Sequence, residues 1–172
     1  MNTFRRHCGL SFFVMLVSTL PLAAEFTVDD PGRFAVNLPE PVKRDSNDVD
    51  TKIGKVRMFT LTHESNEAAF IIAYGDYPAG SLSKTDRATT YDNFIEGVVQ
   101  NLKGVLRSGA EHRLARIAGR EWIIDMAKDK LVARERCYIV GDRLNQIMFL
   151  GPAGAENGAA VFSFMNSFRL LR

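Results

Sequence analysis

Apolar and polar residues alternate through much of the second half of the chain. Three successive runs within residues 120–150 alternate with a period of two, and short polar turns separate them at 128–130 and at Gly141-Asp142. Because successive side chains of a strand point to opposite faces, this period is typical of β-strands. The pattern predicts a three-strand antiparallel meander at the centre of a sheet.

The first part of the chain adds a further strand and a polar stretch. Residues 33–38 alternate in the same way, and Pro39 and Pro41 end that run because proline cannot donate to a strand ladder. Residues 42–50 are dense in charged, serine and asparagine side chains. This composition predicts a solvated loop or hairpin tip.

Three more runs predict strands around the meander. In residues 51–64 the apolar positions change phase between Met58 and Phe59, which predicts a β-bulge. The nearly continuous apolar run at 69–74 predicts a central strand that is covered on both faces, and residues 109–117 predict an outer strand.

Two segments show helical spacing instead. The first, about 86–103, places one apolar stripe at offsets 0, 3, 4, 7 and 11, with Gly104 as the expected left-handed stop. The second, about 156–167, carries a shorter stripe. The stripes consist of Tyr91, Phe94, Ile95, Val98 and Leu102, and of Val161, Phe164, Met165 and Phe168. The order of elements predicts an α+β domain in which these two main helices flank an antiparallel sheet of about six or seven strands.

Residues 1–24 have the pattern of a signal peptide. Arg5 and Arg6 precede an apolar run that is too short to span a bilayer comfortably, and small residues end at Ala24. We expect cleavage after Ala24, export to the periplasm or secretion, and a single globular domain at 25–172 without a membrane span. Retention of the segment as an anchor stays open.

Charge removes one class of partner. The net charge of +2 comes from Arg5 and Arg6, because the other 20 basic residues balance the 20 acidic residues. A mature domain of zero net charge lacks the positive field that favours nucleic acid, so we expect no nucleic-acid partner.

Cys137 is the one cysteine that remains after Cys8 leaves with the signal segment. It lies in an alternating strand pattern, which favours a small buried side chain. An intermolecular disulfide or a reactive thiol stays open, and so does the choice between a monomer and a weak dimer.

Four segments resemble a group of small exported bacterial proteins without assigned function. They are residues 70–80, 137–147, 150–152 and 164–170. The layout of the chain is similar to the PsbP-like fold, in which helices flank an antiparallel sheet. The resemblance implies this architecture, and it implies no catalytic or metal-binding residues.

The sequence contains no local motif for catalysis or metal binding. His63 and His112 are not in ligand spacing with each other, with Cys137 or with a carboxylate, and a nucleophile elbow and a phosphate loop are both missing. We therefore predict no metal and no cofactor.

The best functional candidate is a row of arginines in the meander. Alternation places two arginines and a tyrosine on one strand face, and the 74–80 loop adds aromatic and acidic side chains near its rim. If that face is partly open, arginine can bind a carboxylate or phosphate. The candidate residues are Arg134, Arg136, Tyr138, Tyr74, Asp76 and Tyr77.

These observations predict a non-enzymatic exported protein that binds an unknown partner protein or a small anionic or apolar ligand through one sheet face and the 74–80 loop. Two alternatives stay open: a hydrolase-like enzyme whose site is assembled only in three dimensions, and a structural dimer linked through Cys137.

Overall fold

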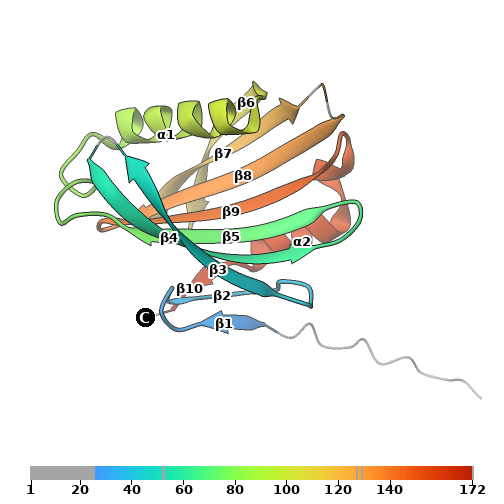
Figure 1. The fold of residues 1–172 in the computed structure, drawn as a ribbon, viewed down its shortest axis with the longest axis horizontal. Coiled ribbons are helices and arrows are strands. Elements are labelled where there is room, and N and C mark those ends of the chain that lie inside the picture. Colours follow the sequence, from blue (N-terminus) through green and yellow to red (C-terminus); the bar gives the residue numbers. More distant parts are fainter. Residues whose placement is uncertain (1–25, 52, 127, 129, 172) are drawn as a thin grey trace, which may run out of the picture.

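A seven-stranded antiparallel sheet runs through the middle of the molecule (Figure 1), in the order β3-β4-β5-β9-β8-β7-β6. A computed structural model describes residues 26–171 except 52, 127 and 129, so the predicted signal segment lies outside the described residues. The strands of the sheet are β3 (Lys43–Thr51), β4 (Gly54–Glu64), β5 (Ala69–Asp76), β6 (Val105–Leu114), β7 (Ile117–Met126), β8 (Leu131–Val140) and β9 (Arg143–Pro152).

Each face of this sheet has its own cover. Helix α1 (Arg87–Leu102) packs on one face, which we call the α1 face. The other face, which we call the α2 face, packs against α2 (Ala159–Ser167) and a small sheet of β1 (Thr27–Asp29), β2 (Phe34–Val36) and β10 (Arg169–Leu170). A 3-10 turn, η1 (Ala155–Asn157), precedes α2. The α+β class, the number of strands and the two flanking helices are confirmed.

The predicted meander forms β7, β8 and β9 and reaches the middle of the sheet. Gly141, with φ at 62°, makes the tight turn between β8 and β9. Strand β9 then pairs with β5, far earlier in the chain, over the full register from Ala69–Leu150 to Asp76–Arg143. The sheet centre is therefore β9, flanked by β5 and β8.

The prediction of a loop at 42–50 is wrong. Residues 43–51 form the edge strand β3, which pairs with β4 along its whole length. Its side chains are exposed on both faces, so the strand carries no apolar alternation to reveal it. Charged residues on an edge strand also discourage pairing with another chain.

The bulge expected in residues 51–64 is also absent from the described part of β4. Strand β4 pairs with β3 and β5 without a register shift. Val56 and Met58 pack on the α1 face, whereas Phe59 and Leu61 pack on the α2 face. The change of phase in the sequence therefore arises because the first part of β4 is buried on the α1 face and the next part is buried on the α2 face. A register shift occurs instead in β6, between Leu106 and Ser108.

Helix α1 begins and ends close to its predicted limits. The Asp86 side chain accepts a hydrogen bond from the backbone N–H of Thr89 at 2.8 Å, so Asp86 is the N-cap. The left-handed residue at the other end is Lys103, with φ at 51°, rather than Gly104. Glycine is needed at 104 for space, because a Cβ there would lie 2.6 Å from Cγ2 of Ile124.

Candidate functional site

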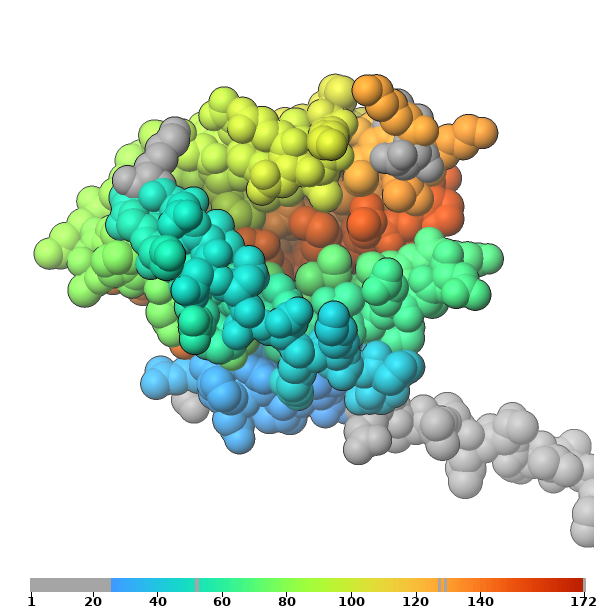
Figure 2. Space-filling view, viewed as in Figure 1, coloured from blue at the N-terminus to red at the C-terminus, as the bar shows by residue number. Residues whose placement is uncertain are grey.

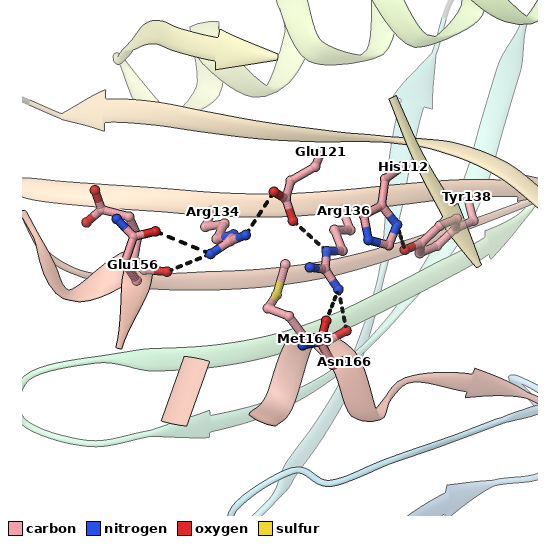
Figure 3. Close-up of polar contacts among 9 residues, drawn as sticks. His112, Glu121, Arg134, Arg136, Tyr138, Glu156, Met165 and Asn166 are labelled. Carbon is pink, nitrogen blue, oxygen red and sulfur yellow. Dashed lines mark hydrogen bonds and ion pairs between the residues drawn. The ribbon is translucent and has the colours of Figure 1, made fainter. Parts of the chain in front are cut away.

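The predicted arginine row lies beneath α2 and is buried (Figure 3). Arg134 is 7% exposed and Arg136 is 5% exposed. Nη2 of Arg134 donates to Oε1 of Glu121 at 2.9 Å, and Nε of Arg136 donates to Oε2 of the same carboxylate at 2.5 Å. One carboxylate on β7 therefore holds both guanidinium groups of β8.

The remaining arginine contacts connect the sheet to η1 and α2. Nη1 of Arg134 donates to the backbone oxygen of Glu156 at 3.0 Å. Nη1 of Arg136 donates to the backbone oxygen of Met165 at 2.9 Å, which caps one carbonyl group near the end of α2, and to the side-chain Oδ1 of Asn166 at 2.8 Å (Figure 3). These contacts give the arginines a structural role. The predicted anion site required this face to be partly open, and the contacts with η1 and α2 close it.

Hydrogen bonding controls the protonation of this cluster. Burial acts to raise the pKa of Glu121, but the hydrogen bonds from Arg134 and Arg136 outweigh it and the pKa is lowered. Next to them, the Tyr138 hydroxyl lies 2.7 Å from Nδ1 of His112, and burial lowers the pKa of His112. The cluster thus pairs its charges internally.

The other predicted residues are divided between the two faces. Tyr74 is buried on the α2 face, where its ring stacks on Phe59 with centroids 5.1 Å apart. Asp76 is exposed and forms an ion pair with Arg143 at 2.6 Å. Tyr77 packs instead against the apolar clusters of the α1 face. The structure therefore does not bring the six predicted residues together in one open site.

Sequence reasoning missed the residue that holds the 74–80 loop in place. The Asp142 side chain, in the β8–β9 turn, accepts backbone hydrogen bonds from Gly80, Leu82 and Ser83 at 2.8–2.9 Å. These bonds lower the pKa of Asp142 well below its usual range. A carboxylate next to glycine in a tight turn is so common that the sequence gives no specific signal for this role.

The α1 face is covered over only half of its width. Figure 2 shows a hollow between α1 in yellow-green and the β3–β4 hairpin in cyan, with β9 in orange-red and β5 in green at its bottom. The apolar cluster under α1 draws its buried sheet residues from β7, β8 and one end of β9. Helix α1 therefore leaves the middle of β5 and β9 uncovered.

We call this hollow the trough and define it by six half-buried residues of the α1 face. Ile71 lies between Thr62 and Met148 in the strand register, and Gln146 lies in the next row with Thr60. The six residues are Thr60, Thr62, Ile71, Gln146, Met148 and Leu150. The trough thus combines an apolar floor on the central strands with a few amide and hydroxyl groups.

An unusual carboxyl group lies beside this floor. Glu135 of β8 is 0% exposed, and neither of its oxygen atoms has a hydrogen-bond partner among the residues that the structure describes. Burial raises the pKa of Glu135 to about 8, so the group is largely neutral at pH 7. The sequence did contain a signal for it, since Glu135 is the one acidic residue in the row Ala133, Glu135, Cys137 and Ile139.

Cys137 lies on the same face, two residues further along β8. Its side chain is fully buried, and burial raises the pKa of the thiol well above its usual range. The interpretation as a small buried side chain is confirmed. A thiol in this position cannot reach a second molecule without disruption of the core, so the structure argues against the Cys137-linked dimer.

Other hollows provide weaker candidates. A cavity of about 180 Å³ lies between the first turn of α1 and the β6–β7 hairpin, and Arg87, Arg113 and Arg120 line it. Arg120 is already paired with Glu111, and Arg87 donates to the backbone oxygen of Ile139. In the described part of the chain, histidine, cysteine and carboxylate side chains form no cluster of three suited to a metal ion.

Comparison with known proteins supports the architecture. No family model and no curated protein sequence matches the chain. Among solved structures, the chain is similar to cyanobacterial PsbP (CyanoP) from Synechocystis sp. PCC 6803, with a TM-score of 0.56 over 85% of this chain and 91% of that chain. The chain has a PsbP-like fold. At 8% sequence identity, the likeness extends to the PsbP-like fold alone.

No helix among the described residues combines the length and the apolar character that a membrane span requires. The comparison concerns the arrangement of helices and strands. The trough and Glu135 are described from the residues of this chain alone.

Proposed function

We propose that this protein is a non-enzymatic exported binding protein whose trough holds the apolar part of a small amphiphilic ligand. The observation that carries the proposal is the half-buried state of Ile71 and Met148, which lie on the two strands at the middle of the sheet. Such positions are normally covered, and a helix covers the equivalent width of the α2 face.

The shape and lining of the trough support a small ligand. Ligand sites are usually concave and mostly apolar, with a few polar groups that fix orientation. The trough is hollowed in Figure 2, and Thr60, Thr62 and Gln146 supply such polar groups beside its apolar floor. A partner protein would fit a flat or protruding surface better than this recess.

The 74–80 loop contributes to the same face. Tyr77 packs against both the cluster under α1 and the small cluster of Val56, Met58 and Ala73. Asp142 holds the following residues 80–83. The loop therefore joins the helix side of the α1 face to its β4 side at one end.

No observation favours an enzyme. The titratable groups nearest the trough are Glu135 and Cys137, and burial shifts both toward their neutral forms. A thiol with a raised pKa is a poor nucleophile.

A neutral apolar dye tests the proposal. We expect N-phenyl-1-naphthylamine to bind the protein with enhanced fluorescence and Ile71→Gln to weaken that binding about tenfold, because the change removes apolar contact from the trough floor. The matched control is Ile117→Gln, since Ile117 is also half-buried but packs on the α2 face. Equal weakening by the two variants, or no binding to the wild type, would contradict the proposal.

A further inference from the structure

Glu135 provides information about the ligand's polar end. Buried polar groups are almost always hydrogen-bonded. A buried carboxyl group without a partner has lost its hydrogen bonds to water and has gained no hydrogen bond from the protein, which costs free energy. Both oxygen atoms of Glu135 lack a partner among the described residues, although the side chain is 0% exposed. In the middle of a well-packed strand, such a group indicates a partner that the chain itself does not supply.

The register places Glu135 beside the trough floor. Glu135 is opposite Trp122 on β7 and opposite Met148 on β9, so the three side chains share the α1 face. Directly opposed side chains of neighbouring strands have Cβ atoms about 5 Å apart. Met148 is half-buried and lies on the floor of the trough. Because methionine is unbranched and flexible, a change in its rotamer can open a path from the trough to the carboxyl group.

The missing partner is a donor rather than an acceptor. Trp122 and Met148 lie in the same row as Glu135, Ala133 lies two residues before it on β8, and none of the three donates a hydrogen bond to it. A ligand carboxylate has no donor of its own, so at least one oxygen of Glu135 would stay without a donor. An ammonium group offers three N–H donors, and its positive charge would favour the ionised form of a carboxyl group that burial alone keeps neutral.

We propose that the ligand of the trough is an apolar chain that ends in an amine, and that the Glu135 carboxyl group binds this amine. The proposal rests on the proposed function, because the apolar chain occupies the trough. The amine gives a hydrogen bond to Glu135, and a second N–H faces the side-chain amide oxygen of Gln146, which lies in the adjacent row on the neighbouring strand β9.

Four amphiphiles with the same dodecyl chain test the head group. Dodecylammonium carries charge and N–H donors, dodecyltrimethylammonium carries charge alone, dodecanol is neutral, and dodecanoate is anionic. Trp122 is the single tryptophan of the chain and is in register with Glu135, so its fluorescence reports binding. Titrations stay below the concentrations at which micelles form.

We expect dodecylammonium to bind the wild type at least about tenfold more tightly than the other three, the change that one charge-assisted hydrogen bond provides. Glu135→Gln should remove this preference and retain binding of the chain. The control is Glu96→Gln, which removes one charge from the exposed side of α1 and should retain the preference. Thermal unfolding establishes that each variant is folded. The preference of the wild type among the four amphiphiles can be measured even if a variant does not fold.

The outcomes separate the two proposals. If all four amphiphiles bind equally well, or if Glu135→Gln retains the preference for dodecylammonium, the assignment of an amine to Glu135 is wrong and the apolar trough stands. If none of the four binds, the proposed function fails and this inference fails with it.

Discussion

On the α2 face, both charged side chains of β8 are paired, whereas the acidic side chain of β8 on the α1 face has no partner within the described residues. Arg134 and Arg136 share Glu121 and also hold backbone oxygens of Glu156 and Met165. Glu135, between them in sequence, points to the opposite face, and neither of its oxygen atoms has a hydrogen-bond partner among the described residues. The same strand thus carries two ion-paired guanidinium groups and a carboxyl group that has no hydrogen-bond partner among the described residues.

This difference separates a structural role from a binding role. Where charged groups are buried to fix a fold, their ion pairs are made within the chain. In the cluster around Glu121 (Figure 3), both guanidinium groups are paired with the carboxylate, although Nε of Arg134 makes no hydrogen bond among the described residues. A buried group whose bonds are not made, beside an uncovered apolar floor, is typical of a site that awaits a ligand. Burial alone does not distinguish the two roles, but the hydrogen-bond partners do.

The largest effect is expected from the loss of Glu121. Glu121→Ala leaves two buried guanidinium groups without their carboxylate, so we expect the free energy of unfolding to fall by about 3–5 kcal/mol in urea denaturation. The control Asp76→Ala removes a partner of Arg143 that is 63% exposed and should cost about 0–1 kcal/mol. Equal losses for the two variants would remove the distinction between the α2-face cluster and an ordinary surface pair.

The next effect concerns Glu135 and pH. The pKa of Glu135 is about 8 in the folded state against an ordinary value of 4.5, so between these values the folded state binds one more proton and stability falls as pH rises. Glu135→Gln removes this loss. We expect the variant to match the wild type near pH 4.5 and to exceed it by about 3 kcal/mol at pH 7, because each pKa unit corresponds to about 1.4 kcal/mol.

Urea denaturation at a series of pH values measures this effect. Glu96→Gln, on the exposed side of α1, is the matched control and should show no gain that grows with pH. A constant difference between Glu135→Gln and the wild type across the series would mean that Glu135 is not buried in its neutral form.

A more local effect is expected at the loop after β5. Asp142→Asn retains the size of the side chain but exchanges a charged acceptor for a neutral one, so the amides of Gly80, Leu82 and Ser83 should exchange with solvent faster. Amide hydrogen exchange followed by NMR measures this change. Unaltered protection of these three amides, with the rest of the protein intact, would show that Asp142 does not hold the loop.

The smallest effect on stability is expected in the trough itself. Thr62 is half-buried on the α1 face, and its hydroxyl makes no side-chain hydrogen bond among the described contacts. We expect Thr62→Val to change the free energy of unfolding by less than about 0.5 kcal/mol and to retain the preference for dodecylammonium over dodecanol, because β5 and β9 separate Thr62 from Glu135. A large loss of stability would identify Thr62 as part of the core.

Periodicity was enough to predict most of the fold. The meander, the apolar strand at 69–74 and the two helices each bury one or both faces, and burial leaves a pattern in the sequence. Strand β3 was missed because neither of its faces is buried. The phase change in β4 was misread because the sequence does not show which cover lies over each part of a strand.

The candidate site was harder to predict for a related reason. Alternation correctly placed Arg134, Arg136 and Tyr138 on one face, but it did not show that α2 covers that face. The trough depends on how far α1 extends across β9 and β5, which is set by tertiary packing. Glu135 stood out in an apolar row, yet its lack of partners is visible only in three dimensions.

Methyl NMR tests the central claim most directly, namely that the α1 face is open to an apolar ligand and the α2 face is closed. Protein labelled at isoleucine and methionine methyl groups is titrated with dodecylammonium. We predict shifts for Ile71 and Met148 in the trough and unchanged signals for Ile147 and Met165, which are buried on the α2 face. Shifts centred on Ile147 and Met165, with Ile71 and Met148 unchanged, would contradict the account.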